Sequence, residues 1–376
     1  MIRTLLCTLT LLLTLSAHAW SNKEHIQLTR LAAERLIADP ATPPAMKEWL
    51  KSACPQLLTP EQERDYFINA RVGIFPRNID GIPYWATVPD MVALTSGSGV
   101  DERKIEPFGV PERMLHFVDL EYFQVSEPQR RYRHDLSTKP KLDAIPYSFK
   151  DGLEANKDAK QWPKAGMLPF RIEQCYAQLI ENLRKKRLTD KSGQFPRDEH
   201  AARWAGYLAH YLEDNTQPQH ATEDYKARSY FADKRSAPNV HWDFEGRLMD
   251  DDQNDYTDLR AEFWDLFSKK LDEVKDKIDT IDLRTASLEV SLISYDALPA
   301  IGLAAMKAYE QGGTPDAPTG GIKGFDAAKF FHHIGKYLGK EMTLMEIKAH
   351  QMAWAEKRVE KLWLRAWNES QQPIEK

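Results

Sequence analysis

The stretch AHYLEDNTQPQH, residues 209–220, is the end of a helix that the sequence predicts over Ala201–Asp214. His210 and Asp214 are four residues apart in it, so both side chains lie on one face of the helix, about one turn apart. Gln217-Pro218 then breaks the helix, and His220 follows directly. The stretch therefore predicts a rigid helical end that carries metal-ligand residue types and is followed at once by another histidine.

A second pair of the same kind lies downstream, where His241 and Glu245 are again four residues apart. Imidazole and carboxylate at this spacing on a helix suit zinc, which binds such nitrogen and oxygen ligands at roughly 2.0–2.2 Å. A single pair often serves only as an ion pair on a helix surface. Two pairs with His220 between them favour a metal site.

Two further candidate ligands lie upstream of these pairs. Asp90 ends the segment WATVPD, next to aromatic residues, and His116 lies in the apolar run MLHFVD. A lone histidine on an apolar face is more often a hydrogen-bonded core residue than a ligand, and both interpretations stay open for His116. Of the other histidines, His332 and His333 are predicted to be structural and His134 to lie in a solvated loop.

Residues 1–19 have the features of a secretory signal peptide. A mostly apolar run follows Arg3, and AHA at residues 17–19 is a small-x-small cleavage site. The run is too short to be a membrane span. Cleavage there would make Trp20 the first residue of a secreted or periplasmic protein, with His25 five residues on. A terminal amine and an imidazole held close together can share a metal, although Trp20 can equally be a frayed terminus.

Length and charge narrow the class of protein. The full sequence has 376 residues and a formal net charge of −5, so no basic excess would draw it to duplex DNA. No stretch after residue 20 is predicted to span a bilayer, which predicts a soluble protein without a transmembrane anchor. Once Cys7 leaves with the signal, Cys54 and Cys175 can form one disulfide or stay as two buried thiols. No protein partner is indicated.

The spacing of apolar residues predicts an all-α fold, because clear strand alternation is scarce. No internal repeat or linker divides the chain, so residues 20–376 are predicted to form a single multi-helix domain. Residues 94–111 are predicted to be irregular, and residues 126–163 to be a long loop or insertion. Besides Ala201–Asp214, helices are predicted over 25–38, 169–186, 258–278 and 283–310, with two more over 327–370 that break near Gly339.

The order of the candidate ligands resembles the superfamily of zinc-dependent phospholipases C and S1/P1 nucleases, secreted all-helical enzymes that begin at a tryptophan created by processing. The matching positions are Trp20, His25, Asp90, His116, His210, Asp214, His220, His241 and Glu245. Residues 209–220 resemble the most specific motif of this superfamily, with Gln219 in place of the common leucine and Glu213 where many nucleases have glycine. The match covers residues 20–245 and does not identify the C-terminal helices within 258–370.

The resemblance implies a fold of the phospholipase C/P1 nuclease type with a cleft for three zinc ions. It further implies hydrolysis of a phosphodiester by a zinc-activated water without a covalent intermediate, with Asp90 as the candidate to orient or deprotonate that water. A closed site would instead indicate a non-catalytic, zinc-stabilised binding protein. The implied ligands are Asp90, His116, His210 and Asp214 for the first ion, His220, His241 and Glu245 for the second, and the Trp20 amine and carbonyl, His25 and the other Asp214 oxygen for the third.

Two features of the series point to different substrates. The final pair, His241 with Glu245, is typical of the phospholipases C, because the nucleases usually end in aspartate. The interval from Trp20 to His25 is instead that of the nucleases. We favour a phospholipase C-like enzyme, with a single-strand nuclease as the alternative, so the expected partner is a phospholipid or a single-stranded nucleic acid. Aromatic residues that can cage a quaternary ammonium, stack a base or simply pack the core are Tyr84, Trp85, Phe117, Trp242 and Phe244.

Overall fold

The computed structural model describes most of the chain from Trp20 onward. The predicted signal peptide, residues 1–19, lies outside the described residues, as does most of the predicted insertion over 126–163. The described residues are 20–73, 75–96, 104–105, 107–123, 134, 136–145, 162–190, 199–251 and 253–373.

These residues are mostly helical, which confirms the predicted predominance of helix. The longer helices are α1 (Asn22–Ala38), α2 (Pro44–Ala53), α3 (Pro60–Asn69), α4 (Ile82–Ser96), α7 (Leu168–Asp190), α8 (Glu199–Thr216), α11 (Thr257–Glu273), α12 (Leu283–Tyr295), α13 (Leu298–Ala308) and α15 (Leu344–Ser370). Shorter ones are α6 (Trp162–Ala165), α9 (Val240–Glu245), α10 (Arg247–Asp250) and α14 (Ala327–Phe331). Single 3₁₀ turns are η1 (Glu112–Leu115), η2 (Leu120–Phe123), η4 (Leu142–Ala144), η6 (Pro218–Ala221) and η7 (Arg228–Tyr230).

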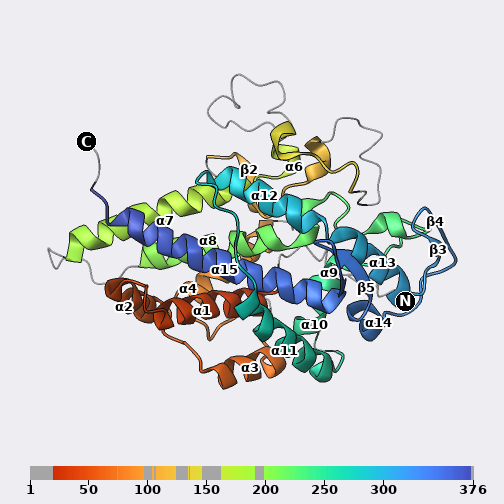
Figure 1. Cartoon of the computed structure of the whole chain (residues 1–376), viewed down its shortest axis with the longest axis horizontal. Coiled ribbons are helices and arrows are strands. Elements are labelled where there is room, and N and C mark those ends of the chain that lie inside the picture. Colours follow the sequence, from red (N-terminus) through yellow and green to blue (C-terminus); the bar gives the residue numbers. More distant parts are fainter. Residues whose placement is uncertain are drawn as a thin grey trace, which may run out of the picture.

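Helix α8 lies at the centre of this arrangement. It packs against α1, α4, α7, α12 and α15, and α7, α8 and α15 run side by side through the molecule (Figure 1). Every residue from Leu208 to Thr216 is buried, so the helix is enclosed on all sides where it carries His210 and Asp214. Gly206 allows the closest approach to α4, because a Cβ there would lie 2.5 Å from the Cβ of Trp85. The predicted ligand pair is thus part of the core.

Local sequence signals explain where the flanking helices begin. The Ser21 hydroxyl accepts a hydrogen bond from the Glu24 backbone N–H, and the Glu24 carboxylate accepts one from the Ser21 N–H. This capping box starts α1 directly after Trp20. Thr343 and Glu346 start α15 in the same way. Helix α4 was not predicted, since Pro89 lies inside it.

The described residues also form three two-stranded hairpins: β1 (Lys104–Ile105) with β2 (Val110–Pro111), β3 (Gly312–Thr314) with β4 (Ala317–Thr319), and β5 (Ile334–Tyr337) with β6 (Lys340–Thr343). The break predicted near Gly339 is the turn of the last hairpin. Leu338 and Gly339 both have positive φ there, as a tight turn that matches the strand twist requires. The helix predicted over 283–310 is divided into α12 and α13, with Pro299 in the first turn of α13.

Two side-chain expectations have definite outcomes. Cys54 and Cys175 are separate buried thiols, so the disulfide alternative is wrong for this structure. The prediction of a solvated loop at His134 is also wrong. Its ring is 4 % exposed and packs against the rings of Tyr230 and Tyr295, so contacts with residues distant in sequence bury this histidine.

The expectation that no stretch after residue 20 could span a bilayer also needs correction. The segment Leu283–Ala308 is long and apolar enough to cross a membrane by length and composition. In the structure 72 % of its most apolar window is buried inside the protein, as in a core helix. Its hydrophobicity is therefore accounted for by packing within this fold.

Candidate metal centre

The C-terminal half of α8 forms the base of the site. His210 Nε2 lies 3.3 Å from Asp214 Oδ2, so the predicted pair shares one face of the helix. His210 Nδ1 lies 2.7 Å from the carbonyl oxygen of Ala86 in α4. Donation from Nδ1 to this carbonyl leaves Nε2 free to bind a metal, which is how histidine ligands are usually oriented.

The first group of ligand types joins α4, η1 and α8. Asp90 Oδ1 lies 3.8 Å from His210 Nε2 and 3.6 Å from His116 Nδ1. His116 Nδ1 in turn lies 3.1 Å from His210 Nε2 and 3.0 Å from Asp214 Oδ2. One ligand atom from each of Asp90, His116 and His210 falls within 4.8 Å of the others. His116 therefore lies within this cluster of potential ligands, although its binding of a metal stays a prediction.

The second group lies where η6 meets α9. His241 Nε2 is 2.7 Å from Glu245 Oε2, and the rings of His220 and His241 have centroids 5.2 Å apart. Ligand atoms of these three residues also lie within 4.8 Å of one another. His220 Nδ1 lies 2.7 Å from the carbonyl oxygen of His116, so the break at Pro218 turns the chain back against the first group.

The third group brings α1 to α8. His25 Nε2 lies 3.7 Å from Asp214 Oδ1 and 3.8 Å from Asp90 Oδ2, and its ring stacks on that of His210. Ligand atoms of His25, His210 and Asp214 lie within 4.8 Å of one another. Trp20, five residues before His25, is fully buried. Its indole N–H donates a hydrogen bond to the carbonyl oxygen of Glu213.

Asp214 lies between all three groups. Its carboxylate is fully buried, and neither oxygen accepts a hydrogen bond of good geometry. Histidine nitrogens surround it instead, from His116 at 3.0 Å to His220 at 3.9 Å. A buried carboxylate without hydrogen bonds is costly unless a cation compensates it. Nitrogen and carboxylate oxygen donors in this number and closeness fit zinc ions that share Asp214.

The charges of the cluster perturb its carboxylates in opposite directions. Burial would raise the pKa of Asp214, but the neighbouring histidines, His210 foremost, bring that pKa below its ordinary value. Burial raises the pKa of Glu245 well above its ordinary value, and the negative charge of Asp90 adds to that effect. Bound cations would remove the repulsion between these carboxylates.

His25 has a different balance. Burial alone would lower the pKa of its imidazole, but the hydrogen bond from Nδ1 to Glu213 and the charge of Glu213 outweigh burial. With the further charges of Asp90 and Asp214, the pKa of His25 rises to about 9. In the protein without metal, the surrounding carboxylates therefore favour the protonated form of this histidine.

The predicted aromatic residues take different positions. Trp85 packs against Tyr84 and against Tyr207, which lies about one helical turn before His210 in α8. Trp242 covers Gly246 at the end of α9. Phe117 is half-buried beside His116, whereas Phe244 is fully buried against Trp20. Substrate binding by Tyr84, Trp85, Phe117 and Trp242 stays a prediction.

Sequence reasoning missed several residues that contact the cluster. Tyr225 is half-buried with its ring 5.5 Å from that of the candidate ligand His241. Lys348 of α15 donates to the carbonyl oxygens of Phe244 and Glu245 at 2.9 and 3.0 Å. The sequence spacing does not predict the contact between Lys348 and Glu245, because it arises from the way α15 packs against α9.

Comparisons with protein-family models, with curated proteins and with solved structures found no match to this chain. The interpretation of the site therefore depends on its own residues and geometry.

Proposed function

We propose that the mature chain is a secreted zinc-dependent hydrolase of phosphodiester bonds, of the phospholipase C type. The observation that carries this proposal is the convergence of three buried ligand groups on Asp214, a carboxylate whose oxygens lie 3.0–3.9 Å from nitrogens of four histidines. A purely structural zinc site needs four ligands around one ion, so it does not account for a cluster of this size.

This proposal assigns the candidate ligands to three zinc ions. Zinc, when bound, supplies Lewis acidity and an activated water for attack on phosphorus. Asp214 would be a ligand of two of the ions. The first would be held by Asp90, His116, His210 and Asp214, the second by His220, His241 and Glu245, and the third by Trp20, His25 and Asp214.

The protein's own groups then have distinct tasks. Asp90 is 1 % exposed and lies between the His25 and His116 nitrogens, where its carboxylate can orient a water and accept a proton from it. Main-chain carbonyls of Ala86 and His116 fix the tautomers of His210 and His220, so that their other nitrogens stay available as ligands. Burial of the cluster excludes bulk water and strengthens every charge interaction in it.

A phosphatidylcholine-type substrate is the favoured choice, because the series ends in His241 and Glu245. The interval from Trp20 to His25 supports the alternative, a single-strand nuclease. The half-buried ring of Tyr225 beside His241 suits either, since an aromatic face can hold a quaternary ammonium or a base.

One experiment separates these possibilities. Purified protein beginning at Trp20 is loaded with zinc and incubated in parallel with phosphatidylcholine vesicles and a single-stranded oligodeoxynucleotide. We expect release of diacylglycerol, abolished in His241→Asn and retained in His332→Asn. The control is matched, because His332 also pairs with a glutamate, Glu262 at 3.0 Å, but on the exposed surface. Nucleotide release without diacylglycerol would favour the nuclease, and bound zinc without turnover of either substrate would favour a binding protein.

The role of Trp20 has a separate test. An extra glycine before Trp20 removes the free amine at that position while leaving the buried indole in place. We expect the extended protein to bind two zinc ions where the mature protein binds three, measured by metal analysis after dialysis. Equal zinc content in both proteins would refute a part for the terminal amine.

A further inference from the structure

Glu213 is the residue next to Asp214, and we propose that it is a positioning residue that aims His25 at the third metal and anchors Trp20 beside it. This inference rests on the metal centre of the proposed function. Successive residues of a helix point about 100° apart, so two neighbouring acidic side chains face different partners. Asp214 faces the ligand cluster, whereas Glu213 faces α1.

The carboxylate of Glu213 spans one turn of α1. Oε2 accepts a hydrogen bond from His25 Nδ1 at 2.5 Å, and Oε1 accepts one from the Thr29 hydroxyl at 3.2 Å. Because His25 and Thr29 are four residues apart on one helix, the two bonds fix both the carboxylate and the imidazole plane. With Nδ1 engaged as donor, Nε2 is the nitrogen that points at Asp214 and Asp90. Carboxylate partners of this kind orient ligand histidines and make them more basic.

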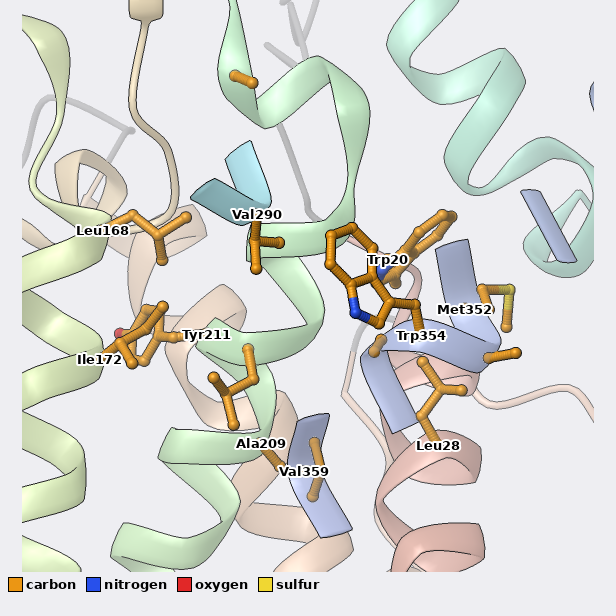
Figure 2. Packing of buried hydrophobic residues seen from close by; sticks show 14 of the residues in the cluster. Trp20, Leu28, Leu168, Ile172, Ala209, Tyr211, Val290, Met352, Trp354 and Val359 are labelled. Atoms are coloured by element: carbon orange, nitrogen blue, oxygen red, sulfur yellow. The ribbon is translucent and has the colours of Figure 1, made fainter. Parts of the chain in front are cut away.

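The main chain of Glu213 holds the other half of the third group. Its carbonyl oxygen accepts the indole N–H of Trp20 at 2.9 Å. The indole is also covered by Phe244, and the Lys348 ammonium lies 4.6 Å from its ring centroid. Figure 2 shows Trp20 within the packed interior, among side chains that include Leu28 of α1 and Met352 of α15. One residue of α8 therefore fixes both residue 20 and residue 25, the two positions that the third site requires.

A buried carboxylate can also serve stability alone, and Glu63 provides the comparison. Like Glu213 it is fully buried and binds side chains of α1, namely Arg30 at 2.6 Å and Gln27 at 2.9 Å. Unlike Glu213, it forms its hydrogen bonds and its ion pair with Gln27 and Arg30, neither of which belongs to the three candidate ligand groups in the described part of the chain. If Glu213 had only a structural role, Glu213→Gln and Glu63→Gln would have similar effects on zinc affinity.

The test compares Glu213→Gln with Glu63→Gln in the mature protein. Zinc affinity is measured site by site through competition with a chromogenic chelator, and folding by circular dichroism. We expect Glu213→Gln to weaken one of the three zinc sites, the third, by about 10- to 100-fold, the usual effect of losing such a partner. Glu63→Gln should keep all three affinities within twofold of the wild type, even if it unfolds more easily. Equal zinc affinities in wild type and Glu213→Gln would overturn the assignment.

A second variant covers the case in which Glu213→Gln does not fold. Thr29→Val leaves the carboxylate and removes one of its two side-chain donors. We expect a smaller loss at the same site, and an unchanged third affinity in Thr29→Val would also overturn the assignment. Failure of the proposed function looks different, because a wild-type protein that binds no zinc, or binds three ions without hydrolysing either substrate, is recognised before any variant is compared.

Discussion

Replacing Gly206 by alanine should push α4 away from α8 and damage the metal centre. A Cβ at this position would lie 2.5 Å from the Cβ of Trp85, 2.7 Å from the carbonyl oxygen of Ile82 and 2.8 Å from the backbone nitrogen of Ala86. All three atoms belong to the backbone or are attached directly to it, so none can rotate away. Ordinary contacts begin at 3.4 Å. The two helices must therefore separate by several tenths of an ångström or more.

Two opposing effects decide the change in stability. Alanine favours a helix interior over glycine by about 1 kcal/mol. Overpacking of a rigid interior typically costs about 1–3 kcal/mol, and three simultaneous rigid contacts place this site at the upper end. We therefore expect a net loss of about 1–2 kcal/mol in the free energy of unfolding. The same shift moves Asp90 and the Ala86 carbonyl away from His210, so zinc at the first group should bind more weakly.

Urea unfolding of the metal-free protein measures the first effect, and zinc analysis of the loaded protein measures the second. Gly321→Ala is the control, because a Cβ there meets no atom within 4 Å. We expect that control to remain within about 0.5 kcal/mol of the wild type with unchanged zinc. If Gly206→Ala were as stable as the wild type and held as much zinc, the close contact between α4 and α8 would not set the geometry of the site.

Three further predictions concern buried groups. Lys348→Met should lower the free energy of unfolding, measured in urea, by about 3–5 kcal/mol, because the buried Glu24 carboxylate, 2.6 Å from the ammonium in the wild type, loses its counter-charge. Recovery of stability in the double variant with Glu24→Gln checks this cause. Burial raises the pKa of the Cys54 and Cys175 thiols, so a disulfide-exchange reagent should label neither until the protein unfolds, and rapid native labelling would contradict the buried positions. The folded-state pKa of His25, about 9, exceeds its ordinary 6.5, so in metal-free protein the stabilisation by its protonated form is complete below pH 6.5 and is lost as the pH rises through 9. This contribution is at most about 3.4 kcal/mol, and His25→Gln should lack the corresponding slope in pH-dependent unfolding.

The sequence predicts those parts of the site that local spacing controls. His210 with Asp214 and His241 with Glu245 share helix faces because four residues make about one turn. The proline after Gln217 ends the helix and returns His220 to the carbonyl of His116. Proximity of these residues is thus a consequence of short-range geometry, although their binding of zinc remains a prediction.

Other features depend on contacts between distant segments and could not be predicted in this way. Helix α4 forms in spite of Pro89 because its packing against α8 outweighs the one hydrogen bond that proline cannot make. His134 reads as a polar loop residue but is buried by Tyr230 and Tyr295. Glu213 was visible only as a departure from glycine in the resembled motif, and its partner on α1 lies 188 residues away in sequence.

The C-terminal helix α15 shows how far such contacts extend the site beyond the residues that carry the resemblance. Its Lys348 ammonium is fully buried and contacts Glu24 of α1, the carbonyl of Glu245 in α9 and the ring of Trp20. A buried cation is costly unless all its partners are present, so these contacts favour one relative placement of α1, α9 and α15. The positions of Trp20, of α9 with its candidate ligands and of the first turns of α15 therefore depend on one another. In the proposed metal centre, the placement of Trp20 and of His241 with Glu245 thus depends on a helix that begins more than 320 residues after Trp20, and that dependence is why α15 belongs to the framework of the candidate site.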